Sequence, residues 1–241
     1  IKTMELDIFL HTLINKYQFN KKQFYNMALI FKQVFEYAFK MSIIKENAYE
    51  KVEISRSVLI KQHQKRSSTE IFNVDEKVVL EESLRNAFSE NDRDTRTASI
   101  LLVFQTGLRV GELVALKWSD IDGDFLELQR TEIKYRKVDK DGSMHPNVIE
   151  VRDFTKGSSG SRRIYMTPKA KLILEQVKAA NEKNGFVSEE DFVFLNDNGR
   201  MRPRTIDSCL RTHCRKCDIP EKSMHRIRKT FISTLIDAGL N

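Results

Sequence analysis

Hydrophobic residues recur at three- and four-residue steps near the start of the chain. This helical spacing is followed by Phe24, Met27, Phe31, Val34, Phe35 and Ala38. Ile1–Leu13 favours an earlier helix and Asn47–Lys51 a short later one, so residues 1–54 are predicted to form a small helical unit. Residues 55–72 lose the periodicity and gain Ser, Lys and Arg, which indicates a basic linker.

A second pattern begins at residue 73 and mixes helical with alternating segments. Asn73 or Asp75 is a good helix cap, and a buried helix at Ala98–Phe104 is expected to end at Gly107. A short helix restarts over Gly111–Leu116. Strands are then predicted at Phe125–Gln129, Val148–Phe154 and Arg163–Met166, with turns at Asp139–Gly142 and Gly157–Gly160.

The last part of the chain returns to helical periodicity. Thr167-Pro168 is a typical helix start, for a helix that runs through about Lys183. From Arg204 onwards the pattern is helical apart from a break around Asp218–Glu221. The predicted fold is therefore mainly α with a small antiparallel β-sheet: a helical unit, a linker, and an α+β domain at residues 73–241.

Composition narrows the class of protein. The 241 residues are 40% hydrophobic and 31% charged, as in ordinary soluble domains. No apolar run approaches the ~20 residues of a membrane span, and Ile1–Asn15 is too polar for a signal peptide. The cysteines are odd in number and close together, so they favour a reducing cytoplasm over a disulfide framework: Cys209, Cys214 and Cys217.

Positive charge is segregated along the chain. Residues 1–72 carry 12 basic and 7 acidic side chains, residues 73–199 carry 19 and 23, and residues 200–229 carry 10 and 3. Two basic blocks around an acidic middle indicate a polyanionic partner, most often nucleic acid. The candidate phosphate contacts are Lys65, Arg66, Arg200, Arg202, Arg204, Arg226 and Lys229. The linker that carries Lys65 and Arg66 fits a solvated surface loop equally well.

Five residues stand where an enzyme would grip and activate a phosphodiester. Arg109 lies in the bend between two predicted helices, with Glu112 one turn further on. His225 and Arg228 are three apart and share a helix face, and Lys156 precedes a Gly/Ser turn. Each feature alone is common: a surface ion pair, a chance pair on a helix, a solvated lysine. Their ordered combination is the informative signal.

These motifs resemble those of the tyrosine recombinase, or phage integrase, family. Thr106–Arg109 with Gly111–Leu113, Leu116, Trp118 and Asp120–Asp122 is similar to the box of its first arginine. His225–Phe231, with Leu235 and Gly239, resembles its second box, and Thr155-Lys156 with Ser161–Ile164 resembles its lysine hairpin. Phe35, Ala38, Ile44 and Asn47 are similar to the family's core-binding domain. The overall likeness is nearest to integrases of conjugative transposons.

The resemblance implies an activity: DNA cleavage and rejoining through a 3′-phosphotyrosyl intermediate, for integration and excision of a mobile element. Arg109 and Arg228 would bind the scissile phosphate, Lys156 would protonate the leaving 5′-oxygen, and His225 would assist proton transfer. Glu112 would orient its neighbours. Neither metal nor cofactor is implied, and no P-loop or acidic two-metal cluster is found. Cys214 and Cys217, near Cys209 and His213, form a Cys-x-x-Cys that would suit zinc. The segment is predicted to be one continuous helix and has no second pair, so a zinc site is not expected.

Departures from the family pattern affect the second arginine box, the lysine turn and both ends of the chain. Arg226 and Lys229 flank Arg228 where other residues are common, and the turn Gly157–Gly160 is slightly long. The family's tyrosine is expected beyond Asn241, and a small DNA-binding domain before Ile1. The tyrosines present match no nucleophile position and are interpreted as core or surface aromatics: Tyr17, Tyr25, Tyr37, Tyr49, Tyr135 and Tyr165. The chain alone is therefore expected to bind DNA without cleaving it.

The resemblance also implies partners. It predicts duplex DNA with inverted core sites, a homodimer on each site, a tetramer in synapsis and an accessory DNA-bending or excisionase protein, in the cytoplasm near a bacterial nucleoid. Two alternatives stay open. One is a type IB topoisomerase with similar chemistry, and the other is a catalytically inert DNA-binding regulator of the same fold.

Overall fold

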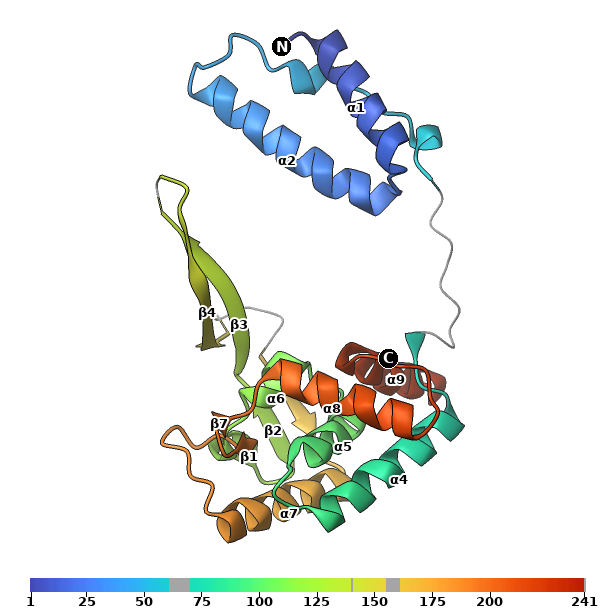
Figure 1. Ribbon diagram of the computed structural model, residues 1–241, viewed down its shortest axis with the longest axis vertical. Coiled ribbons are helices and arrows are strands. Elements are labelled where there is room, and N and C mark those ends of the chain that lie inside the picture. Colours follow the sequence, from blue (N-terminus) through green and yellow to red (C-terminus); the bar gives the residue numbers. More distant parts are fainter. Residues whose placement is uncertain (61–69, 140, 155–160, 241) are drawn as a thin grey trace. The chain divides into compact units, whose positions relative to one another are not determined.

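The chain folds into helices and paired strands that pack around two separate hydrophobic cores. The computed structural model covers residues 1–60, 70–139, 141–154 and 161–240 (Figure 1). It divides into two units, Ile1–Lys65 and Arg66–Asn241. No helix within the described ranges is long and apolar enough to cross a membrane.

The first unit is built on two helices, α1 (Thr3–Tyr17) and α2 (Lys21–Lys40). Asn20 caps α2 by accepting a hydrogen bond from the backbone N–H of Gln23, 3.0 Å away. The 3₁₀ turns η1 (Ala48–Lys51) and η2 (Arg56–Val58) follow. A small core of Leu6, Leu10, Phe35 and Ala48 joins α1, α2 and η1.

The second unit is largely helical. Its α-helices within the described ranges are α4 (Val74–Glu90), α5 (Arg96–Thr106), α6 (Val110–Val114), α7 (Pro168–Asn184), α8 (Pro203–Lys216) and α9 (Met224–Asp237). Asn73 caps α4, and α5 ends at Gly107 in the left-handed conformation, both as predicted. Thr167 and Pro168 start α7, and a break separates α8 from α9, again as predicted.

In the part of the chain that the structure describes, the strands form three small antiparallel sheets, whereas the sequence predicted one. After the 3₁₀ turn η3 (Trp118–Asp120), β1 (Ile121–Asp122), β2 (Phe125–Leu128) and β5 (Arg162–Tyr165) pair in the order β1-β2-β5. β3 (Arg130–Val138) and β4 (Met144–Asp153) form a long hairpin, and β6 (Leu195–Asn196) pairs with β7 (Gly199–Arg200). The sequence analysis missed β3 because its burial alternates only weakly and its outer half is exposed.

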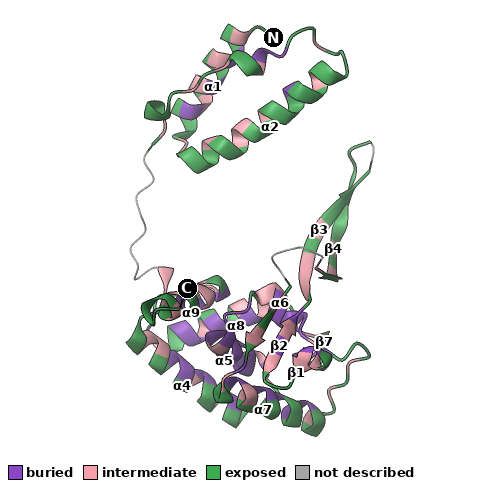
Figure 2. Cartoon of the chain, turned by 180° about the vertical axis from the view of Figure 1, so that it is seen from behind, coloured by how far each residue is buried: buried purple, intermediate pink, exposed green. Residues whose placement is uncertain are grey.

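Helix α5 is the centre of the second unit. Its residues Thr97–Phe104 are all buried, and it packs against α4, α7, α8 and α9 (Figure 2). A helix that is apolar on every side must be covered on every side, and its neighbours supply that cover. The ends of α5 are consequently fixed, and the C-terminal end leads directly into Arg109.

Both ends of the predicted linker, 55–72, belong to the folded units. Ile60 donates a backbone hydrogen bond to Phe19, 3.0 Å away, and η2 lies within the first unit. At the other end Phe72 is 2% exposed and packs edge-on against Phe104 of α5. The predicted phosphate contacts Lys65 and Arg66 lie outside the described residues.

Candidate active site

Gly107 and Arg109 form a sharp bend between α5 and α6. Gly107 has φ +63, and a Cβ built on it would lie 2.3 Å from the Phe231 ring of α9. Only glycine fits there without strain. Arg109 follows in an extended conformation as the N-cap of α6, with its side chain 55% exposed. Arg109 thus lies in the bend between two helices that the sequence analysis predicted, and its guanidinium is exposed to solvent.

Glu112 is the buried anchor of the site, because its side chain is only 1% exposed. It accepts hydrogen bonds from the backbone N–H and the Nη1 of Arg109, at 2.9 and 2.8 Å. Arg162 grips both carboxylate oxygens in a fork, at 2.9 and 2.8 Å. Burial would raise the pKa of Glu112, but the hydrogen bonds from Arg162 and Arg109 hold it below the usual value.

Arg228 reaches the same place from α9. Its guanidinium donates a hydrogen bond to the backbone carbonyl of Gly107. Burial lowers the pKa of Arg228, as do the positive charges of Arg109 and Arg162, while Glu112 opposes them. Two guanidinium groups thus bind one buried carboxylate, and a third, that of Arg228, is close enough to interact with their charges. Their excess of positive charge is what an oxyanion would neutralise.

The predicted set has two further members, His225 and Lys156. His225 lies in the first turn of α9, three residues before Arg228, and is exposed. It makes no side-chain hydrogen bond to any residue within the described ranges. Lys156 lies outside the described residues. The structure therefore brings together Arg109, Glu112 and Arg228 of the predicted set.

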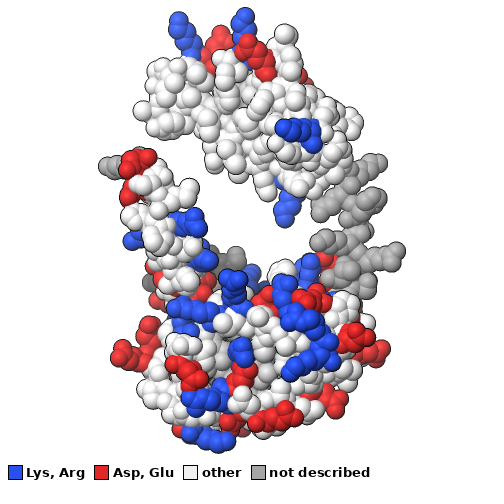
Figure 3. Space-filling model, viewed as in Figure 1, with Lys and Arg blue, Asp and Glu red and all other residues white. Residues whose placement is uncertain are grey.

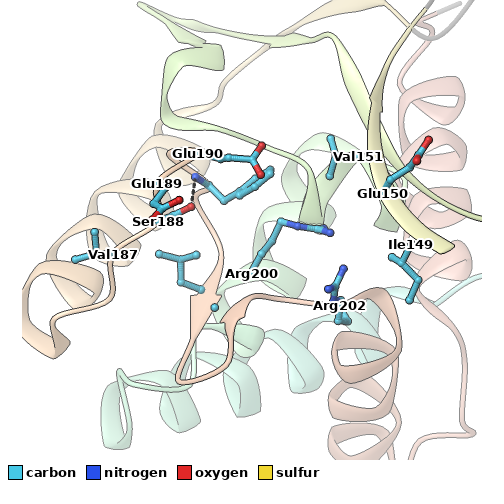
Figure 4. A pocket seen from close by; sticks show the side chains of 12 residues that line it. Ile149, Glu150, Val151, Val187, Ser188, Glu189, Glu190, Arg200 and Arg202 are labelled. Carbon is cyan, nitrogen blue, oxygen red and sulfur yellow. Dashed lines mark hydrogen bonds between the residues drawn. The ribbon is translucent and has the colours of Figure 1, made fainter.

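The basic segment 200–204, at the start of α8, contains one partly buried and two exposed arginines. Arg200 is 12% exposed, binds Glu132 of β3 at 2.6 Å and stacks on Phe192 with its guanidinium 5.1 Å from the ring centroid. Arg202 is 50% exposed and reaches the same Glu132 oxygen at 3.2 Å. Both border a hollow of about 540 Å³ beside the β3–β4 hairpin (Figure 4). Arg204 is exposed. The burial of Arg200 favours a structural role over the predicted phosphate contact.

Arg226 and Lys229 share one carboxylate. Both donate hydrogen bonds to Oε2 of Glu70, and the backbone N–H of Phe72 binds the Thr230 hydroxyl at 2.8 Å. Residues 70–72, at the start of the second unit, are thus bound to α9 by hydrogen bonds. Figure 3 shows further Lys and Arg side chains gathered over α8 and α9.

Three residues of this region were missed by sequence reasoning: Arg162, Glu132 and Glu70. Each contacts a partner far along the chain, at separations of 50 residues for Arg162 and Glu112, 70 for Glu132 and Arg202, and 156 for Glu70 and Arg226. No local spacing signals such pairs. The only available signal was the presence of Arg162 in the segment that resembles the lysine hairpin.

Comparison with known proteins identifies the family. The phage integrase family profile matches residues 77–241. This range includes the bend at Arg109, the β3–β4 hairpin and helix α9, which carries Arg228. The chain belongs to the phage integrase family. This membership confirms the resemblance that the two arginine boxes carried.

Two relatives agree with this assignment. A XerC-like tyrosine recombinase of Caldanaerobacter subterraneus is 32% identical over 156 residues, which cover 59% of this chain and 39% of that protein. The ICEBs1 integrase of Bacillus subtilis is 27% identical over 143 residues, which cover 57% and 36%. The chain therefore spans well under half the length of these phage integrase relatives.

Solved structures of the family share the fold. The Tn1549 transposon integrase in complex with transposon right end DNA aligns with a TM-score of 0.72 and 18% identity, over 100% of this chain and 74% of that one. A lambda integrase tetramer bound to a Holliday junction aligns with a TM-score of 0.61 and 14% identity, over 100% and 61%. These matches confirm the mainly α fold with small antiparallel sheets.

Proposed function

We propose that this chain is the DNA-clamping and phosphate-binding part of a site-specific recombinase, serving integration and excision of a mobile element. The observation that carries the proposal is the convergence of Arg109 and Arg228 on one place, beside a buried Glu112. Family membership and the mobile-element relatives support it. The helical unit at residues 1–54 and the domain at residues 73–241 would both bind the duplex.

The chemistry begins at the scissile phosphate. Arg109 and Arg228 bind its non-bridging oxygens and neutralise the charge that builds in the transition state, an effect worth about 10²–10³ in rate per donor. A tyrosine hydroxyl attacks phosphorus and forms the 3′-phosphotyrosyl bond, while the bond to the 5′-oxygen breaks. Lys156 gives that oxygen its proton, and His225 hydrogen-bonds the phosphate or takes the tyrosine proton. Reversal by a second 5′-hydroxyl rejoins the strand.

We place the attacking tyrosine outside residues 1–241. Tyr49 packs on Phe35 in the first core, Tyr135 donates a hydrogen bond to Glu150, and Tyr165 packs edge-on against Phe125. Tyr17, Tyr25 and Tyr37 lie on the first unit. None of these tyrosines makes a hydrogen bond to Arg109 or Arg228 within the described parts of the chain. Residues 1–241 alone would therefore bind DNA without forming an adduct.

The proposed recombinase function also implies binding partners. We infer duplex DNA with inverted core sites, a dimer on each site, a tetramer during synapsis, and an accessory DNA-bending or excisionase protein, in a bacterial cytoplasm near the nucleoid. The tetramer described for lambda integrase supports the oligomeric part.

One experiment separates this proposal from its two alternatives. The chain selects its preferred duplex from a random library, and that sequence is then offered to the longer protein that also carries the tyrosine. Joining of two such duplexes supports a recombinase. Relaxation of supercoiled DNA without joining indicates a topoisomerase, and binding without either reaction indicates an inert regulator.

A further inference from the structure

Arg162 lies where two parts of the second unit meet. It is the first residue of β5 and pairs with Leu128 of β2, so the sheet fixes its backbone. Its side chain crosses to α6 and grips both oxygens of Glu112, at 2.9 and 2.8 Å. One bidentate contact thus connects the β1-β2-β5 sheet to α6, the helix whose N-cap is Arg109.

Charge explains what this contact does for Arg109. The carboxylate of Glu112 is almost wholly buried, and its bond to Arg109 Nη1 would cancel much of that arginine's charge. Arg162 supplies a second positive charge to the same carboxylate. The group of Arg109, Arg162, Arg228 and Glu112 then keeps two net positive charges, whereas without Arg162 it would keep one.

The geometry points to Arg162 as a positioning residue for phosphodiester chemistry: it neutralises and holds Glu112, so that Arg109 stays fixed yet free to bind the phosphate. This inference rests on the proposed function. Arg162 acts in this proposal through its bidentate contact with Glu112, not through a contact with the DNA. A bidentate fork also orients better than a single ammonium would.

Arg163 is a matched control. It follows Arg162 in the same strand, its side chain is 53% exposed, and it binds Asp122 and Glu127 at 3.1 and 3.3 Å. It therefore carries the same charge next to the same backbone, but without a contact to Glu112 in the described structure.

The test uses chain 1–241 and inorganic phosphate as the probe, observed through the arginine Nε–H NMR signals. Phosphate should shift the Arg109 and Arg228 signals saturably in the wild type. Arg162→Gln should weaken this binding by about fivefold to tenfold, as loss of a nearby charge requires. Arg162→Lys should lose less of the phosphate affinity than Arg162→Gln does, and Arg163→Gln should bind phosphate as tightly as the wild type.

The double variant Glu112→Gln/Arg162→Gln decides between positioning and direct contact. Removal of both charges leaves no buried carboxylate to compete for Arg109, so binding should return to within about twofold of the wild type. If the double variant binds as weakly as Arg162→Gln, or if Arg162→Gln binds normally, the inference is overturned.

Failure of the wild type to show a saturable shift would also overturn it. The proposed function is judged separately, by the covalent adduct of the longer protein. Thermal melting of each variant, monitored by the fluorescence of Trp118, verifies that the second unit is folded.

Discussion

The guanidinium of Arg228 donates a hydrogen bond to the backbone carbonyl of Gly107, across 121 residues of sequence. This contact joins the end of α5 to the face of α9, next to the bend that presents Arg109. The two arginines of the site are thus set by one backbone turn, and changes to that turn should affect both.

Replacement of Gly107 by alanine should destabilise the second unit. The left-handed backbone costs about 1 kcal/mol with a Cβ, and the clash with Phe231 should cost about 2 kcal/mol more. Gly185→Ala is the control, because Gly185 also has a positive φ but would meet no atom within 4 Å. Urea unfolding followed by Trp118 fluorescence measures both. Equal losses for the two variants would contradict the close packing on Phe231.

The stabilisation supplied by ionised Glu112 should depend on pH. Its pKa is lowered in the folded chain from the usual 4.5, so its contribution is complete above about pH 4.5 and declines as pH falls toward the folded value. Glu112→Gln should therefore be less stable than the wild type at pH 7, by about 1–3 kcal/mol, with a difference that shrinks below pH 4.5. Urea midpoints from pH 7 to 3 test this, with exposed Glu90→Gln as the control. A constant difference would contradict it.

The arginines at the start of α8 should separate into two classes. Arg202→Ala and Arg204→Ala should weaken binding of all duplexes alike and flatten the salt dependence by about one unit or less each. Arg200→Ala should mainly lower stability, by about 3 kcal/mol, because among the described residues it leaves the Glu132 side chain, 6% exposed, with Arg202 as its ionic partner. Fluorescence anisotropy at several salt concentrations and urea unfolding measure the two effects. Loss of sequence preference at an unchanged salt slope would argue against phosphate contacts.

Removal of the Glu70 charge should strengthen DNA binding. Glu70 pairs with Arg226 and Lys229, two candidate phosphate contacts on α9. Glu70→Gln frees their charge and should raise duplex affinity several-fold at low salt, with a salt slope steeper by about one unit. Glu50→Gln on η1 is the control in the first unit. Unchanged affinity would show that Arg226 and Lys229 do not face DNA.

The contacts between neighbouring residues of the site could be predicted from the sequence, whereas the contacts between residues far apart in the chain could not. Gly107, Arg109 and Glu112 lie within six positions, so helix caps and turn rules place them together. Arg162 meets Glu112 only because β5 pairs with β2, and that pairing is a property of the whole fold. The β3–β4 hairpin was half missed for a related reason: its exposed outer residues carry little of the alternation that marks a buried strand.

The measurement that tests the central claim most directly is covalent attachment to a nicked suicide duplex by the longer protein that carries the tyrosine. Arg109→Ala and Arg228→Ala should each lower the rate of adduct formation by about 10²-fold or more, with duplex affinity within a few-fold of the wild type, because both arginines act on transition-state charge. Arg163→Gln should form adduct at the wild-type rate. Wild-type levels of adduct in either alanine variant would contradict the assignment of Arg109 and Arg228 to the scissile phosphate.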